Sequence, residues 1–309
     1  MNYRGRFAPS PTGPLHFGSL VTAVGSYLDA RRHQGAWLVR MEDLDRPRCV
    51  PGAGDDILRT LEALHLYWDE SVLYQSQRDE AYQTALDRLI ASGSAYPCAC
   101  TRKEIADSAL YGAEGQIYPG SCRDGLPSGR SARAWRVRTH NTTIVFEDGI
   151  QGRIEQNLER EIGDFVVKRA DGLFAYQLAV VVDDAEQGIT DIVRGADLLT
   201  STARQIHLQH LLGLPTPHYR HLPVAVNAQG EKLSKQTLAE PIAVQQPSLA
   251  LVQALQFLRQ NPPADLPACR PDEVLAWGVQ HWQPALLHSL RALPSTPREF
   301  HCQFVPVIR

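Results

Sequence analysis

The stretch "RGRFAPSPTGPLHFGSL" near the start of the chain places a proline- and glycine-rich turn between two apolar segments. Tyr3–Phe7 has the pattern of a short strand, and apolar residues recur at helical spacing over Gly18–Gln34. The following "AWLVRMED" is an apolar run with a charged end, which is typical of a buried parallel strand. This order predicts a βαβ unit whose strand ends share the ligand-binding edge of an α/β sheet. Further amphipathic helices are expected over Asp55–Leu66 and Asp79–Ser92.

The turn after the first strand also has the properties of an anion site. A helix N-terminus presents free backbone N–H groups and the positive end of the helix dipole. His16 and Ser19 add donors at the start of the helix, and Arg6 and Ser10 add donors just before it. A rigid loop without a ligand is the alternative, and the turn alone does not decide. The sequence has neither the Walker A pattern nor the G-x-G-x-x-G dinucleotide pattern.

Two charged segments are further candidates for the same site. "RMEDLDRPR" (Arg40–Arg48) follows the predicted central strand and places Glu42 where a carboxylate could bind an amino group or a ribose. "EKLSKQ" places Lys232 and Lys235 on a tight loop, and lysine is a compact phosphate binder. Each segment by itself could equally be a solvated surface.

Taken together, these segments resemble the signatures of class I aminoacyl-tRNA synthetases. "HFGS" (16–19) is similar to the HIGH-type motif, with Ser19 in place of its last His, and "KLSKQ" is similar to the KMSKS-type loop. "RFAPSPTG", "RMEDLD" and "AVVVDDAEQGITDIVRGADLLTSTARQ" resemble the glutamyl group of these enzymes. The resemblance covers residues 4–240.

The resemblance implies a ligase that activates L-glutamate to glutamyl-adenylate without tRNA. ATP is then a substrate, accompanied by Mg²⁺. The implied catalytic residues are His16, Lys232 and Lys235, and the implied ATP-binding residues are His16, Gly18, Ser19 and Lys235. Glu42 would hold the α-amino group of the substrate glutamate. A guanidinium can bind the side-chain carboxylate of that substrate in a bidentate pair. The implied glutamate-binding set is Arg6, Phe7, Ala8, Pro9, Ser10, Glu42, Tyr176 and Arg194.

The implied fold is of the α/β class, with a Rossmann-like parallel-sheet catalytic domain made of residues 1–95 and 158–236. A small α+β domain is expected as an insertion at 96–157, with strands at "ARAWRVRT" and "TTIVFEDGIQGRIEQN" and a hairpin turn at Asp148–Gly149. Residues 237–309 are expected to form a short, mostly helical domain. This segment is too short for the anticodon-binding part of a full glutamyl-tRNA synthetase.

Cysteines cluster in the expected insertion. "CAC" contains Cys98 and Cys100, and "YPGSC" contains Tyr118 and Cys122. A structural zinc site takes four ligands, and phenolate is not a usual one, so three reduced core cysteines are the alternative. The resemblance favours one structural Zn²⁺ held by Cys98, Cys100, Tyr118 and Cys122, as in short glutamyl synthetase-like proteins.

The short segment after the KMSKS-type loop is similar to that of the glutamyl-queuosine tRNA(Asp) synthetases. These enzymes transfer glutamate to the queuosine base at the wobble position of tRNA(Asp), so the implied partner is its anticodon stem-loop. The net charge of −3 excludes a general polyanion binder, so RNA would need a local basic patch. The candidates are Arg130, Arg133, Arg136 and Arg138, with a solvated strand edge as the alternative.

Other functions are left open by the sequence. One is a conventional glutamyl-tRNA synthetase without its anticodon-binding domain, and another is a non-catalytic tRNA-binding paralogue. A nucleotidyltransferase of the same superfamily is more distant. The chain starts without an apolar signal segment, and its apolar runs are too short to span a membrane. Its cysteine usage fits a reducing compartment, so we expect a cytoplasmic monomer without membrane contact.

Overall fold

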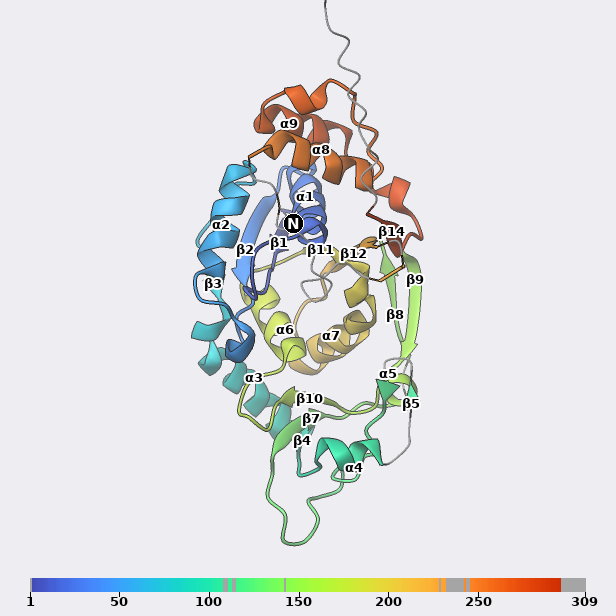
Figure 1. Cartoon of the computed structure of the whole chain (residues 1–309). Helices are drawn as coiled ribbons and strands as arrows, with labels where there is room; N and C mark the ends of the chain where they lie inside the picture. The colour runs from blue at the N-terminus through green and yellow to red at the C-terminus, as the bar shows by residue number, and fades with distance from the viewer. Residues whose placement is uncertain are drawn as a thin grey trace, which may run out of the picture.

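Parallel strands occupy the middle of the molecule in this computed structural model (Figure 1). β1 (Arg4–Phe7) pairs in parallel with β2 (Ala36–Met41), and β2 pairs in parallel with β3 (Leu73–Tyr74). The strands expected from the sequence at this position are therefore confirmed. The structure describes residues 2–107, 111–112, 115–141, 143–227, 229–231, 242 and 245–295.

A second parallel pair continues this arrangement on the other side of β1. The Thr190 backbone N–H donates to the Arg4 carbonyl at 3.0 Å, which places β11 (Asp191–Gly195) beside β1. β11 pairs in parallel with β12 (His218–Leu222). The carboxyl ends of these parallel strands therefore lie at one edge, as the βαβ pattern predicts.

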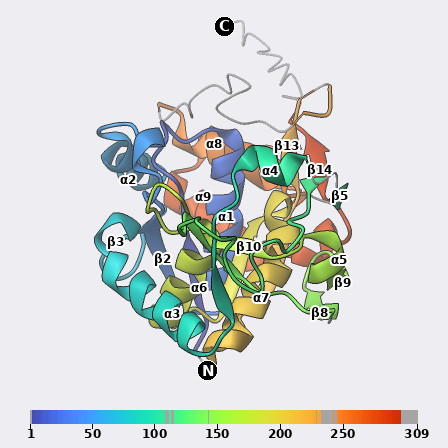
Figure 2. The ribbon, with the colours of Figure 1, turned by 90° about the horizontal axis from the view of Figure 1, so that it is seen from below.

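Helices cover the strands and connect them. α1 (Phe17–Arg32) links β1 to β2 and buries residues all round, because strands lie on one side of it and C-terminal helices on the other. α2 (Ala53–Ala63) and α3 (Asp79–Ala91) confirm the two amphipathic helices expected from the sequence. α3 packs against α6 (Tyr176–Glu186), which packs against α7 (Leu199–Leu212) (Figure 2). None of the helices in the described part of the chain is long and apolar enough to cross a membrane.

An antiparallel sheet forms one end of the molecule (Figure 1). Its middle strand is β7 (Ala134–Val137), flanked by β4 (Ala95–Cys98) and β10 (Phe165–Lys168). α4 (Arg102–Ala106) and the short pair β5 (Tyr111–Gly112) and β6 (Gly115–Gln116) lie in the segment between β4 and β7. Short 3₁₀ helices elsewhere cover Arg46–Arg48, Gln75–Gln77, Ala196–Leu198, Leu266–Ala268 and Pro284–Leu287.

The expected hairpin is formed by β8 (Thr143–Asp148) and β9 (Gly152–Asn157), followed by α5 (Leu158–Glu161). β8 pairs with β12 through Asp148 and Tyr219, so this hairpin extends the β11–β12 sheet. β10, which the sequence places in the catalytic domain, joins the sheet of the insertion instead. Strand pairing thus crosses the expected boundary at residue 157 in both directions.

The C-terminal part packs on α1 at the opposite end of the molecule from β4 and β7 (Figure 1). It contains α8 (Pro247–Phe257) and α9 (Pro271–His281), and a strand that the sequence did not predict, β14 (Ala292–Pro294), pairs with β13 (Val224–Val226). Buried Asp29 of α1 accepts hydrogen bonds from Tyr3 Oη at 2.5 Å and from Trp282 Nε1 at 2.8 Å. These bonds tie the C-terminal helices to the first strand and helix.

Candidate active site

A cavity of about 770 Å³ opens at the carboxyl edge of the parallel strands. Its walls come from the ends of β1, β2 and β11, from the segment after β12, and from the N-terminal ends of α1 and α6. Every predicted glutamate or ATP residue in the described part of the chain lines it: Arg6, Phe7, Ala8, Pro9, Ser10, His16, Gly18, Ser19, Glu42, Tyr176 and Arg194. Lys232 and Lys235 lie outside the described residues.

Backbone hydrogen bonds join the proline-rich turn to the end of β2. The Glu42 N–H donates to the Pro9 carbonyl at 2.9 Å, and this bond places the Glu42 carboxylate beside the turn. His16 caps α1, and its Nδ1 accepts from the Ser19 N–H at 3.3 Å. Since Gly18 and Ser19 also line the cavity, the positive end of the α1 dipole faces the same space as Glu42.

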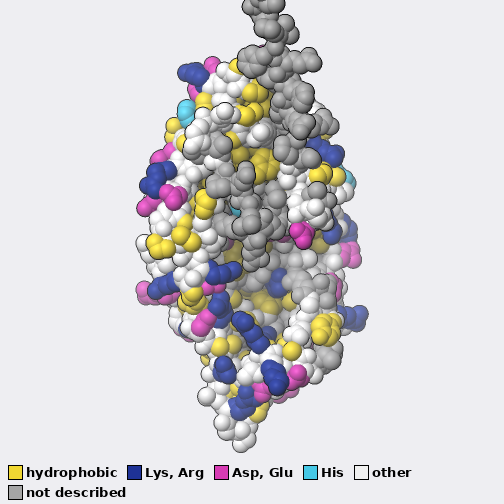
Figure 3. Space-filling model, viewed as in Figure 1, with side chains coloured by type: hydrophobic (Ala, Val, Ile, Leu, Met, Phe, Trp, Pro, Cys, Tyr) yellow, Lys and Arg dark blue, Asp and Glu magenta, His cyan; other side chains and the backbone are white. Residues whose placement is uncertain are grey.

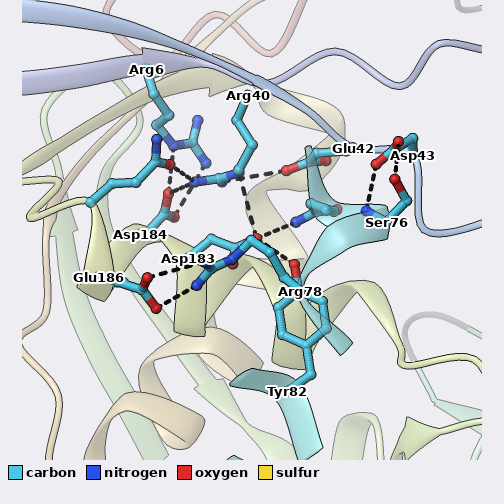
Figure 4. Close-up of polar contacts among 12 residues, drawn as sticks. Arg6, Arg40, Glu42, Asp43, Ser76, Arg78, Tyr82, Asp183, Asp184 and Glu186 are labelled. Atoms are coloured by element: carbon cyan, nitrogen blue, oxygen red, sulfur yellow. Dashed lines mark hydrogen bonds and ion pairs between the residues drawn. The ribbon is translucent and has the colours of Figure 1, made fainter. Parts of the chain in front are cut away.

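Two arginines from neighbouring strands meet at one carboxylate beside the cavity (Figure 4). Arg6 Nε lies 3.0 Å from Asp184 Oδ1, and Arg40 Nη1 lies 2.7 Å from the same oxygen. All three side chains are buried. Burial would raise the pKa of Asp184, but the charges of Arg40 and Arg6 hold that pKa below its ordinary value. Asp184 is therefore ionised, and it fixes the position of Arg6.

Glu42 is a largely buried carboxylate that lines the cavity, with 10% of its side chain exposed. Its Oε1 lies 3.4 Å from Arg40 Nη2. Burial raises the pKa of Glu42, although the charges of Arg40 and Arg6 act in the opposite direction. A cationic amine in the cavity would stabilise this carboxylate, since it would supply a positive charge where water is excluded.

The neighbouring aspartate of α6 holds the other side of this cluster (Figure 4). Asp183 Oδ1 accepts from Arg78 Nε at 2.7 Å. Asp183 Oδ2 accepts from Gln75 Nε2 at 2.7 Å and from Tyr82 Oη at 2.9 Å. Arg78 also binds Glu186 nearer the surface. These contacts join α3 and α6 behind the cavity.

Arg40, Asp183 and Asp184 are functional candidates that no sequence motif indicated. A signal was present in "LAVVVDD", because two adjacent aspartates end an apolar run inside a helix. A buried carboxylate needs a charged or hydrogen-bonding partner, so such a pair predicts arginine partners without saying which ones.

Arg194 lies at the end of β11 and has a different environment from Arg6 and Arg40. Its Nε lies 3.0 Å from His221 Nε2, and its Nη2 donates to Thr202 Oγ1 at 2.9 Å. Its Nη1 is buried and has no hydrogen-bond partner among the residues that the structure describes. Arg194 also lines the cavity, so its guanidinium lies at the cavity wall.

The sequence comparisons identify the family. The model of the class I tRNA synthetase (E and Q) catalytic domain matches residues 2–260. The chain belongs to this family. Curated relatives include two proteins named "Glutamyl-Q tRNA(Asp) synthetase". The one from Aromatoleum aromaticum is 63% identical over 280 residues, covering 91% of this chain and 89% of the relative. The one from Dechloromonas aromatica is 63% identical over 282 residues, covering 91% of this chain and 94% of the relative.

Solved structures agree with this fold. The crystal structure of the glutamate-tRNA synthetase from Elizabethkingia anophelis is similar with a TM-score of 0.78 and 24% sequence identity. The similarity covers 96% of this chain and 68% of that one. The α/β fold with a class I synthetase catalytic domain, expected from the sequence, is therefore confirmed.

The cysteine cluster of this class I synthetase lies in the insertion, away from the cavity. The Sγ atoms of Cys98, Cys100 and Cys122 all lie within 4.8 Å of one another. Tyr118 Oη lies 3.4 Å from Cys98 Sγ and 3.6 Å from Cys100 Sγ, and Cys100 and Cys122 Sγ are 3.7 Å apart. Tetrahedral Zn–S bonds of about 2.3 Å separate two sulfurs by roughly 3.8 Å. The three cysteines therefore fit a zinc site in chemistry, and the Cys100–Cys122 spacing fits it in geometry, while Tyr118 would be an unusual fourth ligand.

Three of the arginines expected to contact RNA, Arg130, Arg136 and Arg138, have side-chain partners within the protein. Arg136 is buried, donates to the Asp164 carbonyl at 2.7 Å and lies over the Tyr118 ring, with Cζ 3.9 Å from its centre. The alternative of a solvated strand edge is wrong for Arg136, because β7 is a middle strand and the side chain is buried, whereas a phosphate contact remains a prediction. Arg138 lies over the Tyr96 ring. In the lower half of the face seen in Figure 3, Lys and Arg side chains lie beside Asp and Glu.

Proposed function

We propose that this class I synthetase activates L-glutamate with ATP and transfers the glutamyl group to the queuosine base at the wobble position of tRNA(Asp). The observation that carries the proposal is one cavity lined by both the glutamate set and the ATP set of residues. Relatives 63% identical over nine-tenths of the chain bear the name of that activity, which supports the choice of acceptor.

In this proposal, Glu42 holds the α-amino group of glutamate, and Arg6 and Ser10 bind the amino acid beside it. Tyr176 completes the pocket. Arg194, at the cavity wall, binds the side-chain carboxylate. A carboxylate and a guanidinium that line one pocket would select a ligand that carries both charges.

ATP would lie at the other end of the cavity, accompanied by Mg²⁺. His16, Gly18 and Ser19 would hold its phosphates at the N-terminus of α1, and Lys232 and Lys235 would neutralise them. The α-carboxylate of glutamate is ionised at neutral pH, so it needs no general base to attack the α-phosphorus. The new P–O bond forms as the bond to the β-phosphate oxygen breaks, and pyrophosphate leaves. Catalysis consists of positioning and charge neutralisation.

The second step would transfer the glutamyl group to the cyclopentenediol of queuosine. A hydroxyl oxygen attacks the acyl carbon, AMP leaves with the electrons of the broken C–O bond, and the hydroxyl proton goes to solvent. The queuosine-containing anticodon stem-loop is the proposed partner, because splayed bases of RNA loops are the usual targets of specific recognition. We propose a monomeric, cytoplasmic enzyme, since this tRNA substrate is found there.

The fit of Cys98, Cys100, Tyr118 and Cys122 supports a structural zinc ion in the insertion. The bound ion would hold β4 and the segment around Tyr118 together. We expect close to one equivalent of zinc in protein purified without chelators, measured by elemental analysis. Protein that is folded and active without zinc would contradict this part of the proposal.

The acceptor is tested with labelled glutamate, ATP and tRNA(Asp) with and without queuosine. We expect glutamate-dependent pyrophosphate exchange without tRNA, and label transfer only to queuosine-containing tRNA. Periodate cleaves free vicinal diols, so pretreatment of a tRNA whose 3′ end is protected should abolish labelling. Labelling that is independent of queuosine would refute the proposed acceptor, and charging of the 3′ end of tRNA(Glu) would indicate a conventional synthetase. Absence of glutamate-dependent exchange would indicate a non-catalytic paralogue.

A further inference from the structure

His221 lies directly behind Arg194, on the side away from the cavity. β11 and β12 pair in parallel with Arg194 opposite His221, and the Nε atom of Arg194 lies 3.0 Å from His221 Nε2. The His221 side chain is fully buried. Its other ring nitrogen, Nδ1, lies 2.5 Å from Asp148 Oδ2. Three neighbouring strands thus bring a carboxylate, an imidazole and a guanidinium into one line.

Asp148 decides which nitrogen of His221 carries the proton. Its Oδ1 accepts from the backbone N–H groups of Ile150 at 3.0 Å, Gln151 at 2.8 Å and His221 at 3.2 Å. Burial would raise the pKa of Asp148, but the hydrogen bonds from His221 and these backbone groups lower it. An ionised carboxylate only accepts, so His221 Nδ1 carries the proton and Nε2 accepts the Arg194 Nε–H.

A neutral imidazole orients Arg194 without cancelling its charge. Burial lowers the pKa of His221 to about 4, so the ring is uncharged at neutral pH. The other partners of Arg194 are also neutral, namely Thr202 Oγ1 and the Leu198 carbonyl. Within the described ranges Arg194 makes no ion pair, whereas Arg6 shares a carboxylate with a second arginine.

We infer that Asp148 and His221 are positioning residues that hold the Arg194 guanidinium at the cavity wall, with no carboxylate of the described residues in contact with it, for the side-chain carboxylate of the substrate. This inference rests on the proposed function and deepens it. It explains why the guanidinium is held by an imidazole: a carboxylate in the place of His221 would neutralise Arg194 and weaken its attraction for an anionic side chain.

The sharpest test is Asp148→Asn, which keeps the side-chain shape. The asparagine oxygen can still accept from the backbone, but its NH₂ then faces His221 Nδ1 and forces the proton onto Nε2. The Nε2–H group would then face Arg194 Nε–H, so that two donors oppose each other. The corresponding aspartate-to-asparagine substitution in the serine protease triad likewise holds the histidine in the wrong tautomer. We expect KM for glutamate to rise about ten- to a hundredfold, with KM for ATP changed less than about twofold.

A second substitution should rescue this variant if the reasoning is right. In the double variant Asp148→Asn/His221→Gln, the glutamine oxygen can accept the hydrogen bond from Arg194 Nε. It can do so whether the asparagine turns its oxygen or its NH₂ group towards the glutamine. We expect KM for glutamate to fall back towards the wild-type value, with His221→Gln alone mildly affected and His221→Leu strongly affected. A purely structural role predicts that the double variant is the worse one.

The tautomer can be read directly from the imidazole ¹⁵N signals of labelled protein. The chain has 11 histidines, and the signal that is lost in His221→Gln belongs to His221. We expect Nδ1–H in the wild type and Nε2–H in Asp148→Asn. An imidazolium or an Nε2–H form in the wild type would overturn the inference, even if Asp148→Asn fails to fold.

The outcomes separate this inference from the proposed function. A wild-type protein that does not activate glutamate overturns the proposed function itself. If the wild type is active, a folded Asp148→Asn that keeps its KM for glutamate overturns only the positioning role. The same holds if the KM values for glutamate and ATP rise alike in this variant.

Discussion

Asp184→Asn keeps the size of a buried side chain but removes the charge between Arg6 and Arg40. Asp184 Oδ1 accepts from Arg40 Nη1 at 2.7 Å and from Arg6 Nε at 3.0 Å, and Oδ2 accepts from Arg6 Nη2 at 3.4 Å. The asparagine oxygen can keep the first two contacts. Its NH₂ group then faces Arg6 Nη2, donor against donor, and two buried guanidinium groups lose their shared carboxylate.

The loss of folding stability should be large, although the substitution replaces only one oxygen by an NH₂ group. Removing one partner of a buried ion pair costs about 3–5 kcal/mol, and the contacts that asparagine retains favour the lower end, about 3 kcal/mol. For a chain of this length, that loss lowers Tm by roughly 5 °C. Glu186→Gln on the same helix is the matched control, because Glu186 pairs with Arg78 but is 59% exposed. Exposed pairs contribute at most about 1 kcal/mol, so its Tm should fall by less than about 2 °C.

The pH dependence adds a second check. The pKa of Asp184 is held below its ordinary value in the folded protein, so its carboxylate stabilises the fold above the unfolded pKa of about 3.9. That contribution is lost only as the pH falls further, towards the folded pKa. The Tm difference between wild type and Asp184→Asn should therefore stay constant from pH 8 to pH 5.

The assay is thermal unfolding of wild type and both variants, with KM for glutamate measured on the same samples. We expect Asp184→Asn to raise that KM as well, because Arg6 loses the group that orients it. Equal Tm shifts for Asp184→Asn and Glu186→Gln would refute the reasoning, as would a Tm difference that disappears between pH 8 and pH 5.

Three further predictions concern other parts of the molecule. Lys235→Ala should lower glutamyl-adenylate formation by about a hundredfold or more without changing Tm, and near-normal pyrophosphate exchange would contradict its assigned role. Burial raises the pKa of Glu42, so its protonation at acid pH, above the range of an ordinary glutamate, should raise KM for glutamate but not for ATP; a KM for glutamate that stays flat there would argue against Glu42 as the amine ligand. Trp282→Phe removes the N–H donor to buried Asp29 and should cost about 1–3 kcal/mol in urea unfolding, whereas an unchanged midpoint would show that this bond does not hold the C-terminal helices.

The sequence alone predicted those elements whose conformation depends on residues close together in the chain. Strand, turn and helix in the first forty residues follow from apolar periodicity and from the prolines between them, and β1, α1 and β2 confirm them. Because parallel strands end at one edge, the same pattern also predicted that Arg6, Ser10 and Glu42 would share a cavity with the start of α1.

The tertiary structure decided which strands and side chains became partners. β8 pairs with β12 and β10 with β7, against the expected boundary at residue 157, since periodicity locates a strand without naming its neighbour. Arg136 has the sequence pattern of an exposed basic strand, yet it is buried in the insertion.

The same reason explains the residues that sequence reasoning missed around the site. Arg40 meets Asp184 across 144 positions of the chain, and His221 meets Asp148 across 73. Such contacts depend on how sheets and helices pack, and no spacing along the chain encodes them. The motifs located the cavity, whereas the packing behind it determined that Arg6 and Arg40 share a carboxylate and that Arg194 is held by an imidazole.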